Sequence, residues 1–268
     1  MPLDPSLRER FLADVADGEL PLPLLPEVVS QALAAIERPD CDARTLAELL
    51  RRDAALTAHV MRIASSPVYA GAVKLVSLQQ VIARLGFAAL RQIVLLVTVG
   101  ARTFRAPGFE AEVRGAFRHA LASALFAQEI ARHRRSSVDL AFLGGLFHDI
   151  GRPLALQALI DLHRERQLQP DRTEVLALAE QVHAAIAGTL LARWDIAPKV
   201  VEACAQHHAP HGVELALVVA LGDCFAHALD GDPFSGAALA AELNIYPDEV
   251  VALAAMTDRI RETVETLT

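Results

Sequence analysis

The stretch FLGGLFHDIGRPLAL, residues 142 to 156, places an adjacent histidine and aspartate, His148 and Asp149, at the end of a strongly apolar run. A buried carboxylate beside an imidazole is costly unless another group binds it. A divalent cation can do so, because imidazole nitrogen and carboxylate oxygen are both good ligands. The alternative is a hydrogen-bonded polar pair that ties two helices together, and the dipeptide alone does not decide between the two.

The chain around this stretch favours helices. It has 268 residues, of which 53% are hydrophobic and only 5% aromatic. That supply of apolar side chains is enough for a sizeable core, and the abundance of alanine and leucine favours helix. No stretch alternates apolar and polar residues as a half-buried strand does, and no Asn-Gly hairpin signal is present. We therefore expect an all-α, multi-helical protein.

Polar residues and glycines predict the limits of several helices. Candidate N-terminal caps are Asp42, Asp53, Ser77, Asp139 and Thr173. Gly86 is expected to end the helix that Ser77 begins. Residues 87 to 103 are apolar on nearly all sides, which predicts a buried helix. A buried strand at 94 to 99 is the alternative, but the flanking residues continue the helical pattern.

Pro107-Gly108 marks a candidate boundary between two packed helical lobes, residues 1–106 and 107–268. A long helix should follow from about Phe109 to Arg134. The last stretch, Val250 to Leu267, is predicted to form an amphipathic helix. It can either cover the core or mediate a homodimer.

Charge and cysteine usage limit the possible partners and compartment. The net charge of −8 disfavours a nucleic-acid partner. Three cysteines far apart in the sequence suit a reducing cytosol rather than a disulfide framework. The N-terminus has no apolar run typical of a signal peptide, and the longest apolar runs are far shorter than the ~20 residues of a membrane span. We expect a cytoplasmic protein with no membrane partner.

The histidines from position 119 onward are the most informative residues. Each lies within or at the end of an expected apolar helix, as does one aspartate, and the set is His119, His183, His207, His208 and Asp223. Each has an ordinary structural explanation. A histidine can pack in a core, the His207-His208 pair can form a surface turn, and Asp223 can pair with a nearby histidine or arginine. Taken together, their order along the chain is more specific.

This order resembles the HD superfamily of metal-dependent phosphohydrolases, in which a helix histidine precedes His-Asp and a later helix supplies an aspartate. The resemblance implies that one metal ion is held by His119, His148, Asp149 and Asp223. The additional histidines resemble the ligands of a second ion in the HD-GYP phosphodiesterases, with Asp149 as the shared ligand and His183, His207 and His208 completing the set. Such a site implies two divalent ions, with iron or manganese favoured over zinc or magnesium.

The resemblance also assigns catalytic roles. Asp149 would be the bridging carboxylate, and Arg152 would replace a phosphate-contacting lysine, since HDIGR here resembles HDIGK of those enzymes. Two features depart from the pattern. The GYP loop is absent after His208, and Gly115 stands where a glutamate would help to bind a third metal.

The N-terminal half resembles the HDOD branch of this superfamily. The matching segments are LPLLP at 22–26, TLAELLRRDAALTAHVMRIASSPVY at 45–69 and SLQQVIARLGFAALRQIVL at 77–95. Ala54 in place of proline and Ser65 in place of asparagine are mild departures. The resemblance covers roughly residues 19 to 225 and implies an all-α domain of bacterial signalling proteins.

Two functions are compatible with these features. The first is a regulatory or interaction module of signal transduction, with a His/Asp metal site and signalling proteins as partners. The alternative is a metal-dependent phosphohydrolase or phosphodiesterase that acts on a nucleotide or cyclic dinucleotide. The absent GYP loop favours the first, and the complete ligand set favours the second.

Overall fold

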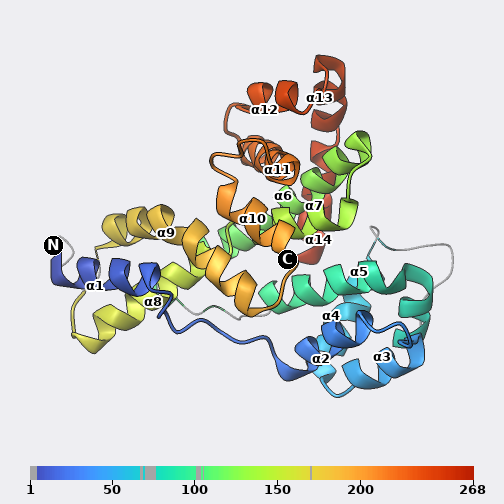
Figure 1. Cartoon of the computed structure of the whole chain (residues 1–268), viewed down its shortest axis with the longest axis horizontal. Coiled ribbons are helices and arrows are strands. Elements are labelled where there is room, and N and C mark those ends of the chain that lie inside the picture. Colours follow the sequence, from blue (N-terminus) through green and yellow to red (C-terminus); the bar gives the residue numbers. More distant parts are fainter. Residues whose placement is uncertain (1–4, 67–68, 70–76, 101–103, 105, 170) are drawn as a thin grey trace. The chain divides into compact units, whose positions relative to one another are not determined.

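The computed structural model describes residues 5–66, 69, 77–100, 104, 106–169 and 171–268. Throughout this part of the chain the regular structure is helical, in helices α1 to α14, and no strand occurs among the described residues (Figure 1). The expected all-α class is confirmed. Residues 94–99 lie within a helix, so the alternative of a buried strand is excluded.

The chain divides into two compact units, each of which draws on separate segments of the sequence. One unit comprises residues 1–23 and 104–258, and the other comprises residues 24–103 and 259–268. The division into lobes 1–106 and 107–268 stays a prediction.

The unit of residues 24–103 and 259–268 is built mainly from four helices. They are α2 (Glu27–Ile36), α3 (Ala43–Leu50), α4 (Ala54–Ala64) and α5 (Leu78–Gly100). The last helix, α14 (Thr257–Leu267), has most of its length here. The prediction of a single helix from Val250 to Leu267 was wrong, because a turn at Ala255 and Met256 separates α14 from the helix before it. Helix α5 packs on α2, α3 and α4, and its second half is buried on nearly all sides, as its apolar sequence predicts. Gly86 interrupts α5 with a φ of 81°, a left-handed conformation that glycine adopts without a Cβ penalty.

The helix caps follow the sequence closely. Asp42 accepts a hydrogen bond from the Thr45 amide, and Asp53 accepts one from the Leu56 amide, so both predicted caps are confirmed. Ser77 likewise accepts from the Gln80 amide. Two predicted caps were each wrong by two residues, because a side chain two positions earlier accepts the hydrogen bonds of the free amides. Ser137 rather than Asp139 caps α7, and Asp171 rather than Thr173 caps α9.

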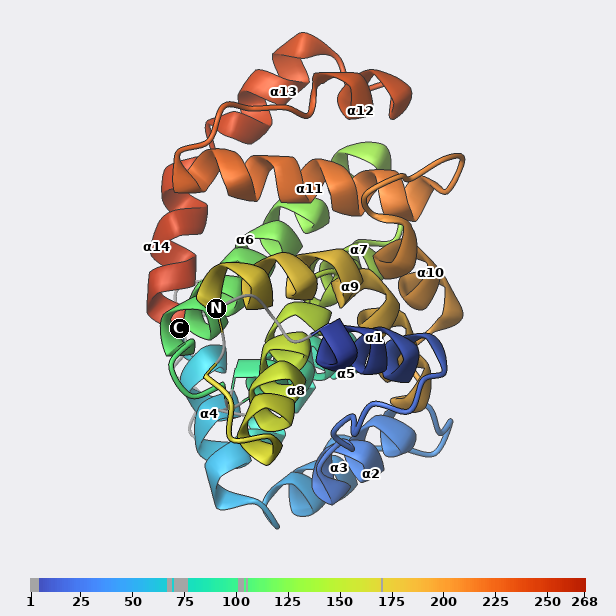
Figure 2. The same ribbon diagram turned by 90° about the vertical axis from the view of Figure 1, so that its left-hand side faces the viewer.

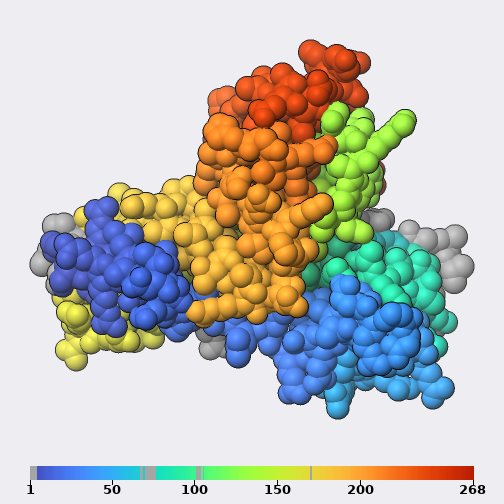
Figure 3. Space-filling view, viewed as in Figure 1, coloured from blue at the N-terminus to red at the C-terminus, as the bar shows by residue number. Residues whose placement is uncertain are grey.

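The other unit holds the remaining helices. They are α1 (Pro5–Ala16), α6 (Glu110–Arg134), α7 (Val138–Phe147), α8 (Gly151–Glu165), α9 (Arg172–Arg193), α10 (Pro198–Gln206), α11 (Glu214–Asp230), α12 (Ala237–Glu242) and α13 (Pro247–Ala254). Helix α6 packs on α7 and α11, while α9 packs on α8, α10 and α1 (Figure 2). The space-filling view shows the blue atoms of α1 directly against the gold atoms of α9 (Figure 3).

Small residues let α6, α7 and α11 approach closely. A Cβ atom built on Gly145 of α7 would lie 2.6 Å from the Cα atom of Ala124 in α6. A side chain at this position would therefore push the two helices apart. The rings of Phe126 in α6 and Phe225 in α11 stack with their centroids 5.1 Å apart. This tight packing brings the middle of α6 next to the end of α7 and the middle of α11.

Helices α5 and α9 are long and apolar enough to cross a membrane by length and composition alone. In the structure, 56% and 50% of their most apolar stretches are buried. A core helix of a folded domain passes the same test, and α9 carries a buried polar residue, His183.

Candidate metal centre

The predicted site residues lie in, or directly after, six helices of one unit, α6 to α11, and converge on one place. His119 lies in the middle of α6, and His148 and Asp149 follow directly after α7. Arg152 lies in the first turn of α8, and His183 in the middle of α9. The pair His207-His208 follows α10, and Asp223 lies in α11. The structure thus brings together all eight side chains, although they span more than a hundred positions in the sequence.

Three histidines share one orienting contact. The Nδ1 atom of each lies within hydrogen-bond distance of the carbonyl oxygen three residues earlier, at 2.8 Å for His148, 2.6 Å for His183 and 2.7 Å for His207. Because a carbonyl can only accept, Nδ1 carries a proton, and in the neutral form of each ring the lone pair is on Nε2. In this arrangement each Nε2 is prepared to bind a cation.

Asp149 lies at the centre of the site and is only 2% exposed. Both of its carboxylate oxygens are buried without a hydrogen-bond partner, and so is Nε2 of His148. Oδ1 of Asp149 lies 3.2 Å from Nε2 of His183 and 3.7 Å from Nε2 of His207. Oδ2 lies 3.4 Å from Nε2 of His148. Buried polar atoms are almost always satisfied, so these three atoms require an explanation.

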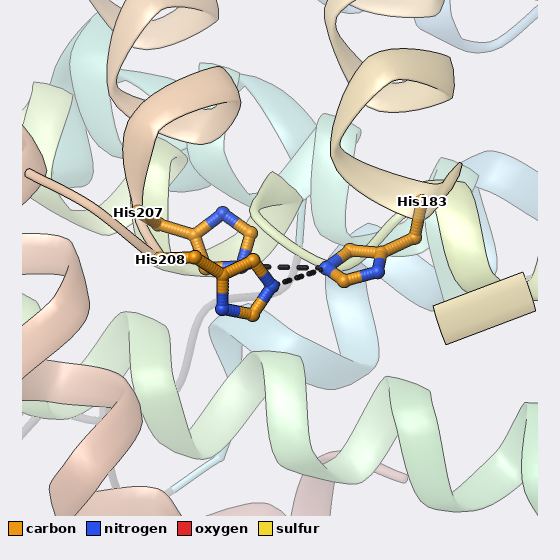
Figure 4. Close-up of side chains that lie close together, drawn as sticks. All are labelled: His183, His207 and His208. Carbon is orange, nitrogen blue, oxygen red and sulfur yellow. Dashed lines mark hydrogen bonds between the residues drawn. The ribbon is translucent and has the colours of Figure 1, made fainter. Parts of the chain in front are cut away.

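His183, His207 and His208 form the first of the ligand clusters (Figure 4). The Nε2 atom of His183 lies 2.9 Å from that of His208 and 3.4 Å from that of His207. Neighbouring nitrogens on one cation, with bonds of roughly 2.1 Å, are separated by about 3 Å. The cluster therefore has the spacing of a metal site before any ion binds.

His119, His148, Asp149 and Asp223 form the adjoining cluster. Nε2 of His119 lies 2.7 Å from Oδ1 of Asp223, and Nε2 of His148 lies 3.4 Å from the same oxygen. The ligand atoms of His119, His148 and Asp149 all lie within 4.8 Å of one another. Asp149 contacts members of both clusters and therefore lies between them.

The two clusters differ in their electrostatics. Burial lowers the pKa of His119, but its hydrogen bond with Asp223 and the nearby carboxylate of Asp230 outweigh burial and raise the pKa to about 9. Burial also opposes the charge of His148, yet Asp149 and Asp223 together raise its pKa. Burial lowers the pKa of His207 to about 3 and also lowers that of His183. Without metal, His119 and His148 therefore form ion pairs with the aspartates, whereas burial keeps His183 and His207 neutral.

Arg152 connects the site to its surroundings. Its Nε atom lies 3.2 Å from Oδ2 of Asp149, and its outer nitrogen lies 3.0 Å from Oε2 of Glu180 on α9. The side chain is 29% exposed, whereas Asp149 beside it is buried. A guanidinium in this position presents positive charge at the boundary between the buried centre and solvent.

Gly151 determines how closely α8 approaches α9. A Cβ atom built on this residue would lie 1.9 Å from the carbonyl oxygen of His183. Only glycine fits, and the contact lies two residues from Asp149. The glycine that follows the His-Asp pair therefore allows Asp149 and His183 to meet.

The sequence prediction missed His227, Glu180 and Asp230. His227 forms a further cluster with His119 and Asp223, and Asp230 lies 3.6 Å from Nδ1 of His119. The spacing of Asp223 and His227, four residues apart on one helix, was a usable signal because it places both on one face. No comparable signal marked Glu180, since its contact with Arg152 depends on how α8 packs on α9.

The donor set fits a divalent cation. It consists of imidazole nitrogens and carboxylate oxygens, with unsatisfied buried oxygens at its centre. The nearby thiol of Cys204 is not part of it, because burial raises the pKa of the thiol and the sulfur contacts the carbonyl oxygen of Gly144 at 3.6 Å. The clusters can hold a metal ion without any thiolate.

Comparison with known proteins identifies the family. The HDOD domain model matches residues 22–210, which is most of the chain, so the protein belongs to the HDOD family. An uncharacterized protein of Treponema pallidum is 25% identical over 238 residues. That match covers 83% of this chain but 45% of the Treponema protein, so the chain spans about half the length of its relative.

Solved structures share the fold over nearly the whole chain. A protein of Shewanella amazonensis, provisionally named a metal-dependent phosphohydrolase, aligns with a TM-score of 0.75 at 21% identity, covering 97% of this chain and 98% of that one. An HDOD domain protein of unknown function from Geobacter sulfurreducens aligns with a TM-score of 0.63 at 21% identity, covering 95% and 97%. A provisionally named signal transduction protein of Marinobacter aquaeolei aligns with a TM-score of 0.66 at 20% identity, covering 98% of this chain and 64% of that one. At these identities the likeness establishes the fold alone.

Proposed function

We propose that this member of the HDOD family is a bacterial signal-transduction module that binds divalent metal in its His/Asp centre and recognises a phosphate-bearing ligand there. Its partners would be signalling proteins, and its place would be the cytoplasm. The amphipathic α14 is a candidate for a homodimer contact. We propose neither a membrane partner nor a nucleic-acid partner. The net charge of −8 disfavours a nucleic acid.

The observation that carries the proposal is the state of Asp149. Its two oxygens are buried without a hydrogen-bond partner, and imidazole nitrogens from α7, α9 and α10 surround them. An ionised carboxylate in such a place costs several kcal/mol unless it is paired. Arg152 approaches from one side only, at 3.2 Å from Oδ2. A divalent cation would satisfy both oxygens and the facing nitrogens together.

The ligand sets divide around Asp149. One ion would be held by His119, His148, Asp149 and Asp223, and a second by Asp149, His183, His207 and His208. Iron and manganese suit this mixture of imidazole and carboxylate ligands, and are proposed over zinc and magnesium. Divalent ions in such a centre neutralise phosphate charge and lower the pKa of bound water.

The proposed ligand is a nucleotide or cyclic dinucleotide. Arg152 supports this choice, because its guanidinium is partly exposed and lies beside the buried centre. A planar guanidinium with several donors matches the oxygens of a phosphate group. Glu180 holds the outer nitrogen of Arg152 at 3.0 Å and would be displaced by a phosphate.

A second candidate is a metal-dependent phosphohydrolase or phosphodiesterase. The specific observation in its favour is that Arg152 and Asp149 lie 3.2 Å apart, so that a phosphate on Arg152 would lie next to the metal ligands. In this case Asp149 would act as the bridging ligand and Arg152 would stabilise charge on the phosphate.

Binding and turnover assays on one preparation distinguish the two. Protein loaded with Mn²⁺ or Fe²⁺ under reducing conditions is titrated with a cyclic dinucleotide and incubated with bis(p-nitrophenyl) phosphate. The module predicts that the dinucleotide binds, that Asp149→Asn abolishes binding, and that neither compound is hydrolysed. Hydrolysis by the wild type and not by Asp149→Asn would replace the module with the enzyme. Absence of both binding and hydrolysis would contradict both.

A further inference from the structure

His227 faces the metal centre but belongs to neither proposed ligand set. It lies on α11, one turn after Asp223, and its Nε2 atom lies 3.6 Å from Oδ1 of Asp223. Its ring lies 4.5 Å from that of His119, measured between centroids. The side chain is 43% exposed, so it sits at the outer edge of the centre.

The end of α11 fixes the orientation of this ring. Gly231 adopts a φ of 107°, and the amide of Asp232 donates to the carbonyl oxygen of His227 at 3.1 Å. This turn, typical of a helix end with glycine, folds the chain back over the last turn. As a result Oδ2 of Asp232 lies 3.2 Å from Nδ1 of His227. The Asp232 carboxylate accepts a hydrogen bond from Nδ1–H of His227, and the Nε2 atom of the same ring faces Asp223.

His119 has the same arrangement. Its Nδ1 atom lies 3.6 Å from Oδ2 of Asp230, and its Nε2 atom lies 2.7 Å from Asp223. Two neighbouring histidines thus each carry an aspartate behind the ring and face one shared carboxylate. A carboxylate behind a metal-binding imidazole is the common device that fixes its tautomer and increases its basicity. An ordinary surface ion pair would need only Asp232.

We propose that His227 is a further metal ligand, bound to the ion that His119 and Asp223 hold, with Asp232 as the carboxylate that positions it. The three ligand atoms lie within 4.8 Å of one another, and ligands on opposite sides of one ion are separated by about 4.2 Å when each bond is roughly 2.1 Å. This inference rests on the proposed metal centre and adds one ligand at its exposed edge.

The test measures the affinity of the full-length protein for Co²⁺ by competition with a chelator, together with the visible spectrum of bound Co²⁺. His227→Ala should lower the affinity for one of the two Co²⁺ ions by 10- to 100-fold and change the spectrum of that ion. Loss of a direct ligand costs at least as much affinity as loss of a supporting group. Asp232→Asn keeps the shape of the side chain and should lower the affinity for the same ion by about tenfold. The other ion should be unaffected in both variants.

His133→Ala is the matched control, because His133 is an exposed histidine in the last turn of α6, away from the cluster residues. It should change neither affinity nor spectrum. His227 and Asp232 are 43% and 67% exposed, so both variants should fold, which circular dichroism would verify. If the wild type binds Co²⁺ and His227→Ala binds it with unchanged affinity and spectrum, this inference is overturned while the metal centre stands. If the wild type binds no metal, the metal centre itself falls.

Discussion

Replacement of Gly151 by alanine tests whether the packing of α8 on α9 assembles the metal centre. The added methyl carbon would lie 1.9 Å from the carbonyl oxygen of His183, and this oxygen is backbone, which cannot turn aside. A normal contact needs more than 3 Å, so the two helices must separate by roughly 1 Å. Overpacking of this kind costs about 1 to 3 kcal/mol of folding free energy.

The same displacement would act directly on the site. Asp149 precedes Gly151 by two residues, and its Oδ1 atom lies 3.2 Å from Nε2 of His183. Metal–ligand distances tolerate shifts of only about 0.2 Å, so a movement of roughly 1 Å should remove His183 from the coordination sphere. We expect Gly151→Ala to lose the ion of the His183, His207 and His208 cluster and to unfold at a lower urea concentration than the wild type.

Gly188→Ala is the matched control, since Gly188 lies on the same helix α9 and nothing lies within 4 Å of an added Cβ atom there. Alanine in a helix interior is favoured over glycine by about 1 kcal/mol. This variant should gain stability and keep its metal. Urea unfolding and metal analysis are the assays. Unchanged stability and full metal content in Gly151→Ala would refute the reasoning.

Two further predictions concern charge. In the metal-free protein the pKa of His119 is raised to about 9, so its ion pair contributes stability that is complete below pH 6.5 and is lost as the pH rises to about 9. The unfolding free energy should fall by about 3 kcal/mol over this window, while apparent metal affinity, which requires loss of that proton, should rise up to tenfold per pH unit. Urea titrations and chelator competition at several pH values test both, and opposite trends would count against the assignment. Glu180→Gln removes the carboxylate that holds Arg152 at 3.0 Å. Phosphate should then bind the metal-loaded protein several-fold more tightly by calorimetry, and weaker binding would show that Glu180 assists rather than competes.

The sequence predicted the helical fold well because the determining signals are local. Caps such as Asp42 and Asp53 bond to amides within three residues, and the break at Gly86 follows from one left-handed residue. The errors are local too. At α9, both Asp171 and Thr173 are residue types that suit a cap. Residue type alone does not determine which of the two side chains accepts the hydrogen bonds of the free amides.

The site was predictable only where a family resemblance supplied the long-range information. Periodicity places His119 on a buried face of α6, but it contains nothing about Asp223, 104 positions later. Contacts between helices depend on packing, which is why the link between Arg152 and Glu180 was missed. His227 was missed for another reason, because the resemblance provides no role for it although its spacing from Asp223 was visible.

The central claim is that the buried imidazoles and carboxylates around Asp149 bind metal, and the metal content of the protein tests it most directly. Protein purified without chelator under reducing conditions should contain two divalent ions per chain by elemental analysis. Asp149→Asn, which keeps the side-chain volume and removes the charge between the clusters, should contain less than one. A wild-type protein with no metal, and with no uptake of Mn²⁺ or Fe²⁺ on addition, would contradict the account.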